Sequence, residues 1–201
     1  MKKVRIPLFV MLIAAFIFGC SGKQQPTTTA AVADPEIAVI EMENPNYGPI
    51  KIEFYSNIAP KMVQRFKDLA KEGVYDGTAF HRINETVVQG GDPLSKDNDP
   101  NNDGTGGSDK PDVPAEFSSV PFDTAIVGAA RSQDINSANS QFFIMLKREA
   151  GFDNKYTVFG KVIEGMDEVF KISKVQPKRG ERPLWPVRIK HVSIVPRDQA
   201  K

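Results

Sequence analysis

Short apolar segments punctuated by Gly, Pro and Asn recur along this chain of 201 residues from about residue 36 onward. Their short length, and the alternation of apolar and polar positions in the clearest of them, are typical of β-strands. The first two strands flank a turn-rich loop at 44–49, which predicts a hairpin. The expected strands lie at 37–42, 50–55, 87–89, 126–128, 142–146, 157–159 and 187–195.

Two segments follow the helical period instead. Residues 60–72 place Met62, Phe66 and Leu69 on one face, and a Pro and a Gly mark the two ends of the segment. A second helix is expected at 165–174. Many short strands with two helices, and without β–α–β alternation, predict a mostly β domain, built as a closed antiparallel barrel.

The first 19 residues differ from the rest of the chain. Three basic residues lead into an apolar run of 13 residues, 6–18, which is shorter than the roughly 20 that a membrane-spanning helix needs. A basic start followed by such a run is typical of a signal peptide. The run ends at Gly19 and Cys20, and this junction resembles a bacterial lipobox, in which the cysteine is lipidated.

We therefore expect a lipoprotein signal peptide at 1–19, and an extracytoplasmic protein anchored to a bacterial membrane through lipidated Cys20. If the cell has an outer membrane, its periplasmic face is the expected location. Ordinary secretion, with Cys20 as a bystander, is the alternative. Residues 20–35 are rich in small and polar side chains and predict a flexible tether, so the folded domain is expected at 36–197.

Charge and cysteine content narrow the function classes. The chain has 26 Lys and Arg against 25 Asp and Glu, which gives no basic footprint for nucleic acid. Three of the basic residues and no acidic one lie in 1–19, so the chain without this segment has a net charge of −2. A single Cys excludes an intramolecular disulfide framework and a thiolate zinc cluster.

Three further segments are richer in polar and aromatic residues than strands require. They hold an Arg, a Gln and several aromatics near expected strand ends, but no nucleophile–base pair and no cluster of metal ligands, so covalent hydrolysis is poorly supported. The segments are 75–82 with 89–93, 129–132 with 136–143, and 152–160.

These segments resemble the cyclophilins, the barrel-shaped peptidyl-prolyl cis/trans isomerases. The sequence contains FHR, then QGGDP, then SQFF, then TVFGKVIEGM, and the resemblance covers residues 36–195. It implies an eight-stranded closed barrel capped by two helices, with a shallow apolar groove for a substrate proline. It also implies a monomer that acts on proline-containing polypeptides and needs no cofactor or metal.

By position in these motifs, the resemblance implies two catalytic residues. Arg82 would donate a hydrogen bond to the proline nitrogen of the twisted peptide bond. Gln89 would orient Arg82 or bind the substrate backbone. Phe143 would form the floor of the proline pocket. The other implied substrate-binding residues are Gln141, Val87, Phe152, Ala130, Arg131, Tyr156 and Thr86.

Simpler interpretations stay open at several of these positions. Taken alone, Arg82 would pair with a carboxylate, and Phe143 would belong to the core. His81 is expected to be a buried histidine that forms hydrogen bonds. Thr86 stands where the family has a pocket Phe, and the chain from Arg82 to Gln89 is one residue shorter than usual. These departures keep a second hypothesis open, a proline-peptide-binding chaperone or receptor with little turnover.

An acidic insertion at 94–103 partly matches an EF-hand loop. Its twelfth position, which should be a bidentate Glu, is Lys110, and this excludes a true EF-hand. A polar surface loop is the expectation. An irregular calcium site formed by Asp97, Asp99, Asn101 and Asp103 is the minor alternative.

Overall fold

The computed structural model describes residues 26–97, 99–176 and 178–199. Eight strands form one antiparallel sheet in the order β10-β1-β2-β7-β5-β6-β4-β3, and β8 and β9 form a separate hairpin. The strands are β1 (Glu36–Met42), β2 (Ile50–Phe54), β3 (Arg82–Ile83), β4 (Val87–Gly90), β5 (Ile126–Ala129), β6 (Phe142–Met145), β7 (Val158–Glu164), β8 (Lys178–Arg179), β9 (Arg182–Pro183) and β10 (Ile189–Pro196).

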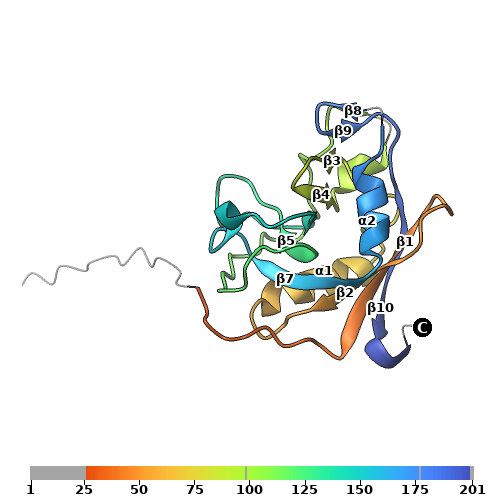
Figure 1. The fold of residues 1–201 in the computed structure, drawn as a ribbon. Coiled ribbons are helices and arrows are strands. Elements are labelled where there is room, and N and C mark those ends of the chain that lie inside the picture. Colours follow the sequence, from red (N-terminus) through yellow and green to blue (C-terminus); the bar gives the residue numbers. More distant parts are fainter. Residues whose placement is uncertain (1–25, 98, 177, 200–201) are drawn as a thin grey trace, which may run out of the picture.

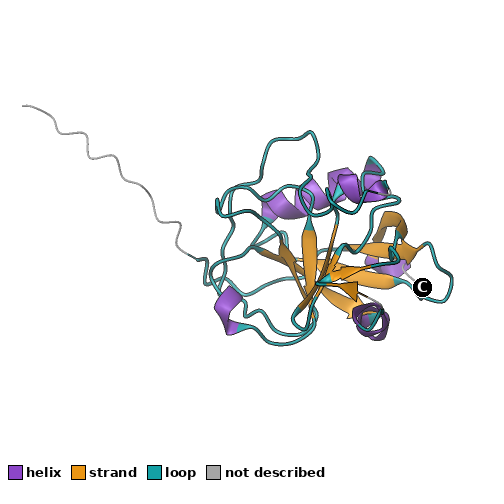
Figure 2. Ribbon diagram, turned by 90° about the horizontal axis from the view of Figure 1, so that it is seen from above, coloured by secondary structure: helices purple, strands orange, loops and turns teal. Residues whose placement is uncertain are grey.

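Two α-helices lie on opposite sides of the strands, α1 (Pro60–Lys71) and α2 (Met166–Ser173) (Figures 1 and 2). Both predicted helices are confirmed to within a residue at each end. In α1 the predicted apolar face, Met62, Phe66 and Leu69, is fully buried. The Phe66 ring lies 4.8–5.6 Å from the rings of Phe54, Tyr75, Phe142 and Phe159, so the helix face completes an aromatic core.

All seven predicted strands are present, and the β1–β2 hairpin is confirmed. β7 is longer than predicted and continues to Glu164. The sequence pattern did not reveal β3, β8 and β9, because each of them has only two residues. Three short 3₁₀ helices complete the described chain, η1 (Pro93–Lys96), η2 (Ala150–Phe152) and η3 (Arg197–Gln199).

The prediction of a closed barrel is only partly right, because the sheet is a curled half-barrel. In the described part of the chain, one isolated bridge spans the gap between the edge strands β3 and β10, where Ala79, before β3, pairs with Arg188, before β10. Phe80 N donates to Val187 O there at 2.9 Å. The chain just before Val187 contains Pro183 and Pro186, which have no N–H to donate, so the pairing does not continue along β3.

Residues 26–35 lie against the domain, although the sequence predicted a flexible tether there. Asp34 accepts a hydrogen bond from Ser56 Oγ at 2.5 Å and pairs with the buried Lys67 at 2.9 Å. Thr27 forms a parallel bridge with Ser118. The side chain of Asp34 and the backbone of Thr27 thus hold this segment against the domain.

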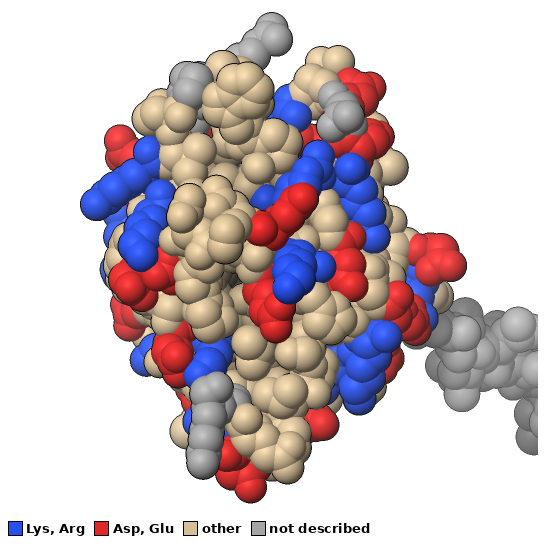
Figure 3. Space-filling view, turned by 90° about the vertical axis from the view of Figure 1, so that its right-hand side faces the viewer, with Lys and Arg blue, Asp and Glu red and all other residues tan. Residues whose placement is uncertain are grey.

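The signal peptide, Cys20 and the start of the expected tether lie outside the described residues. Within the described ranges, no helix is both long and apolar enough to span a membrane. On the face shown in Figure 3, which is the right-hand side of Figure 1, basic and acidic side chains are interspersed without a large patch of one sign. This face gives no basic surface of the kind that nucleic acid requires.

Candidate active site

A row of four residues crosses the sheet at the middle of the candidate site. Arg82 on β3 is in register with Gln89 on β4, Gln89 with Phe143 on β6, and Phe143 with Gly128 on β5. Residues opposite each other in antiparallel strands point to the same face. The fold thus brings the three central predicted residues, Arg82, Gln89 and Phe143, onto one face.

The polar half of this row is a chain of hydrogen bonds. Arg82 Nη1 donates to Gln89 Oε1 at 3.1 Å, and Gln89 Nε2 donates to Gln141 Oε1 at 2.9 Å. Gln141 Nε2 then donates to the backbone oxygen of Gly106 at 2.8 Å. Gln89 is thus hydrogen-bonded to both Arg82 and Gln141, and its role in orienting Arg82 stays a prediction.

Arg82 also pairs with a carboxylate that the sequence analysis did not identify. Its Nε donates to Glu181 Oε2 at 2.5 Å. The simpler interpretation of Arg82, as the partner of a carboxylate, agrees with this contact, and its catalytic role stays a prediction. In the described part of the chain, these two contacts use two of the five N–H groups of the guanidinium.

The apolar half is a cluster of aromatic rings around Phe143. Phe143 stacks on Phe122 with ring centroids 5.8 Å apart, and it meets Phe152 and Tyr156 edge-on at 5.6 and 5.7 Å. Phe143 is only 3% exposed, whereas Phe152 and Tyr156 are partly exposed. A proline ring that contacts the floor residue must therefore reach it beside Phe152 and Tyr156.

Gly128 is a site residue that the sequence analysis missed. A Cβ at this position would lie 2.3 Å from Cζ of Phe143 and 2.8 Å from Cε1 of Phe122. The ring of Phe143 therefore lies directly over the glycine backbone. A glycine inside the predicted strand 126–128 was the available signal, because such glycines mark close approach by a neighbouring group.

Val87, and not Thr86, occupies the pocket side of β4. Val87 is 2% exposed and belongs to the same apolar cluster as Phe143. Thr86 contacts β6 through its backbone, because its backbone oxygen accepts a hydrogen bond from Leu146 N at 2.8 Å. The side chain of Thr86 is thus not part of the cluster, although the resemblance implies that it binds substrate. The short turn before β4 places Val87, the next residue, on the face of Phe143.

The predicted rim residues lie together beside Gln89. Ala130 follows β5 and packs against the Phe143 cluster. The guanidinium of Arg131 lies 4.5 Å above the ring of Tyr156 and donates to the backbone oxygen of Lys155 at 2.9 Å. Arg131 and Gln141 also line a hollow of about 210 Å³.

His81 is buried as expected, at 5% exposed, but the expected hydrogen bonds are missing. Neither ring nitrogen has a hydrogen-bond partner among the described residues. Burial lowers the pKa of His81, although the nearby Asp92 and Asp103 oppose this shift. This direction favours the neutral imidazole at neutral pH, and His81 directly precedes β3, on which Arg82 lies.

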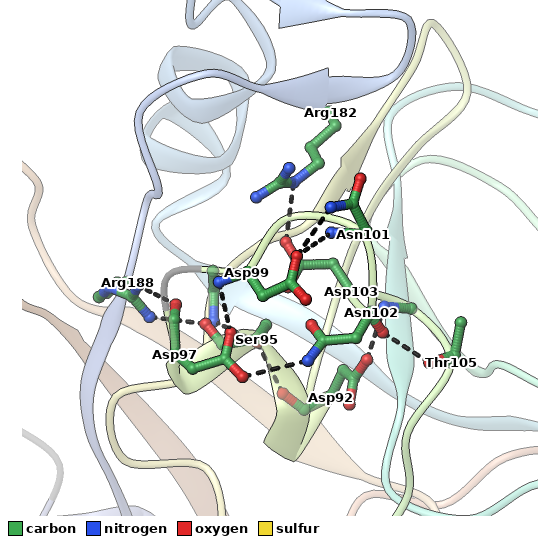
Figure 4. A network of polar contacts seen from close by, with 12 residues as sticks. Asp92, Ser95, Asp97, Asp99, Asn101, Asn102, Asp103, Thr105, Arg182 and Arg188 are labelled. Carbon is green, nitrogen blue, oxygen red and sulfur yellow. Dashed lines mark hydrogen bonds and ion pairs between the residues drawn. The ribbon is translucent and has the colours of Figure 1, made fainter.

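The acidic insertion folds back on itself (Figure 4). Asp92, just before it, is fully buried and accepts hydrogen bonds from the backbone nitrogens of Leu94 and Gly106 at 2.9 and 3.2 Å. Asp97 accepts from the backbone of Asp99 at 2.7 Å, and Asp103 pairs with Arg182 at 2.8 Å.

The minor calcium hypothesis gains no support from this geometry and stays a prediction. Asp103 is paired with an arginine, and the oxygens of Asp97 and Asp99 accept hydrogen bonds within the loop. Across residues 26–97, 99–176 and 178–199, no three His, Cys, Asp or Glu side chains are grouped in a way that could hold a metal ion.

Comparison with known proteins identifies the family that this chain is similar to. Residues 39–194 match the family model described as cyclophilin type peptidyl-prolyl cis-trans isomerase/CLD. A probable peptidyl-prolyl cis-trans isomerase of Brucella abortus is 47% identical over 167 residues, which cover 80% of this chain and 82% of that protein. A peptidyl-prolyl cis-trans isomerase of Schizosaccharomyces pombe is 35% identical over 158 residues, which cover 76% and 96% of the two chains.

A solved structure has the same fold. The crystal structure of a cyclophilin type peptidyl-prolyl cis-trans isomerase from Cryptosporidium parvum, determined in the presence of the dipeptide Ala-Pro, superposes with a TM-score of 0.70. The sequences are 27% identical, and the match covers 79% of this chain and 98% of that chain.

Proposed function

The chain belongs to the cyclophilin-type peptidyl-prolyl cis-trans isomerases, and from this premise we propose that it accelerates X-Pro rotation in extracytoplasmic proteins with the help of Arg82. The observation that carries the proposal is the row in which Arg82, Gln89 and Phe143 face the same side of the sheet. A polar group that stabilises a twisted amide stands here beside an apolar floor for the proline.

The chemistry needs no covalent intermediate. Rotation about a peptide bond has a barrier of about 18–20 kcal/mol, because twisting breaks amide resonance. In the twisted state the proline nitrogen regains a lone pair and becomes a hydrogen-bond acceptor. A guanidinium that donates to this nitrogen binds the twisted state more tightly than either planar isomer, and this difference lowers the barrier.

Arg82 has the features that this step requires. An arginine guanidinium offers five N–H donors in a rigid, planar fork. Its Nη1 is held by Gln89 and its Nε by Glu181, while three N–H groups are left for a substrate. The Arg82 side chain is 46% exposed, so a bound peptide can reach it.

The apolar cluster supports binding of the proline ring. Val87, Phe143 and Phe152 would contact the ring, and Tyr156 and Ala130 would border it. Gln141 and Arg131 would contact the peptide backbone beside the hollow that they line. The Cryptosporidium relative was crystallised in the presence of Ala-Pro, which is consistent with an X-Pro segment as the ligand of this chain.

A coupled peptide assay tests the enzyme proposal. The purified protein should accelerate the cis-to-trans conversion of a proline peptide, which takes tens to hundreds of seconds when it is uncatalysed. Arg82→Ala should lose most of this acceleration. A wild-type protein that binds the peptide without accelerating the conversion would instead support the proline-peptide-binding chaperone or receptor.

The extracytoplasmic location rests on the first 20 residues of the sequence. The basic start, the short apolar run and the cysteine that follows it support a lipoprotein signal with Cys20 as the lipidated residue. In bacterial cells the wild-type chain should sediment with membranes, and its N-terminal peptide should carry acyl chains in mass spectrometry. Cys20→Ser should remove both properties, and unchanged sedimentation of this variant would contradict the anchor.

A further inference from the structure

The β8–β9 hairpin places its turn beside the candidate active site. The turn consists of Gly180 and Glu181, and Gly180 has a φ of +63°. A two-residue hairpin turn often needs a left-handed residue at its first position, which favours glycine there. The next residue, Glu181, then stands at the tip of the hairpin, above β3.

Glu181 contacts β3 and the following turn through three groups. Its Oε2 accepts from Arg82 Nε at 2.5 Å, and its Oε1 accepts from Asn84 Nδ2 at 2.9 Å. Its backbone oxygen accepts from Ile83 N at 2.6 Å. The backbone contact does not depend on the side chain, so the hairpin stays against β3 when the carboxylate is replaced.

The hairpin is also held from its other side. Arg182, next to Glu181, pairs with Asp103 at 2.8 Å, and the Asp103 side chain is only 8% exposed (Figure 4). Asp103 is the last residue of the acidic insertion. The insertion therefore supports the hairpin, and the hairpin in turn presents Glu181 to Arg82.

These contacts fix the guanidinium of Arg82 from two directions. Gln89 holds Nη1 from β4, and Glu181 holds Nε from the hairpin. Exposed ion pairs usually contribute little to stability. Here the pair closes one end of the chain of hydrogen bonds that runs through Gln89 and Gln141, and this chain determines the plane in which Arg82 presents its remaining donors.

We propose that Glu181 is a positioning residue of the isomerase, which aims Arg82 at the proline nitrogen without contacting the substrate itself. This inference rests on the proposed function of Arg82. Misplacing a catalytic group by about 1 Å can cost up to about 100-fold in rate. Loss of the Glu181 carboxylate should therefore reduce turnover more than it reduces peptide binding.

The test compares Glu181→Ala, Glu181→Gln and Glu85→Ala with the wild-type protein. Glu85 is the matched control, because it lies on the turn after β3, is exposed, and among the described residues pairs only with Lys147, at 3.6 Å. Glu181→Ala should lower kcat about 10-fold with little change in KM, as expected when an interaction specific to the transition state is lost. Glu181→Gln retains an acceptor oxygen and should lose about threefold, and Glu85→Ala should match the wild type.

The NMR resonance of the Arg82 Nε–H distinguishes a positioning role from a purely structural one. It reports directly on whether Glu181 holds the guanidinium. In the wild type, the Nε–H of Arg82 should exchange slowly with water, because it is bonded to Glu181. In Glu181→Ala this resonance should broaden or disappear, while the backbone amides of β4 and β6 keep their positions. A folded Glu181→Ala variant with wild-type kcat would overturn the positioning proposal. A wild-type protein with no isomerase activity would overturn the proposed function instead.

Discussion

The two halves of the site are built in different ways. In the polar half, Arg82 and Gln89 are linked by one hydrogen bond, and the Arg82 side chain is 46% exposed. In the apolar half, Phe143 and Val87 are 3% and 2% exposed, and Phe143 is packed against three other rings. The apolar half is thus a part of the core, and under the proposed function it also forms the proline pocket.

This difference separates stability from catalysis. A buried ring contributes to the free energy of unfolding and to the pocket at once, since its removal leaves a cavity. An exposed hydrogen-bonded side chain contributes little to unfolding, but it can contribute much to the transition state. Substitutions in the apolar half should therefore change both properties, and those in the polar half should change activity alone.

The largest expected effect is that of Phe143→Ala. It should reduce the free energy of unfolding by about 3–5 kcal/mol and abolish activity. Phe142→Ala is the matched control, because Phe142 is fully buried on the opposite face of β6. It should cost similar stability, yet retain more activity per folded molecule. Urea unfolding and the peptide assay measure both quantities, and equal activity losses would break the comparison.

Arg82→Ala should show the opposite separation. Its activity should fall about 10²- to 10³-fold, the usual effect of removing one donor from a transition state. Its free energy of unfolding should stay within about 1 kcal/mol of the wild type. Lys190→Ala removes a cation–carboxylate pair that is exposed on both sides, with Glu41 at 3.4 Å, and should change neither property. A stability loss of several kcal/mol in Arg82→Ala would place Arg82 with the apolar half.

Gly128→Ala tests where the two halves join. The new methyl group would collide with Phe143 and Phe122, and such overpacking typically costs about 1–3 kcal/mol. Activity should also fall, because the floor ring has to move. Gly48→Ala is the control, since its nearest contact would be an ordinary 3.4 Å. Thermal melting of both variants is the measurement, and equal melting temperatures would contradict the close approach at Gly128.

The smallest expected effect is a dependence on pH through Glu181. The hydrogen bond from Asn84 and the pairing with Arg82 lower the pKa of Glu181 below 4.5, against the opposing effect of partial burial. A lowered pKa means that the stabilisation is present above pH 4.5 and is lost as the pH falls through the folded-state value. Because the pair is exposed, the difference in unfolding free energy between wild type and Glu181→Gln should stay below about 1 kcal/mol at pH 7.

Denaturant titrations from pH 7 down to pH 3 measure this difference. It should shrink toward zero at the acid end, because a protonated Glu181 no longer pairs with Arg82. A difference that grows as the pH falls would have the wrong sign for an ion pair.

Much of the fold could be predicted from local patterns. The apolar face of α1 and the strands with more than two residues follow from periodicity. The spacing of their apolar residues can be read from positions that are close together in the sequence. The two-residue strands were invisible to such patterns. Local patterns also did not reveal that residues 26–35 dock on the domain. A composition that suggests a flexible tether is equally compatible with a segment that forms hydrogen bonds with the domain.

The candidate site divides in the same way. The motifs around Arg82, Gln89 and Phe143 identified the row, but their spacing suggested a place in the pocket for Thr86. The structure gives that face to Val87. His191 pairs with Asp76 at 2.9 Å across 115 positions of the chain, a contact that no local pattern indicates.

The amino-acid sequence by itself determined the family, the strands and helices with clear periodicity, and three residues of the central row, Arg82, Gln89 and Phe143. Only the tertiary structure decided that the barrel is not fully closed, that Gly128 lies under Phe143, and that Glu181 pairs with Arg82. The physical reason is distance along the chain. Arg82 and Glu181 are 99 positions apart, and no local pattern can encode which of many exposed carboxylates an arginine will meet once the chain is folded.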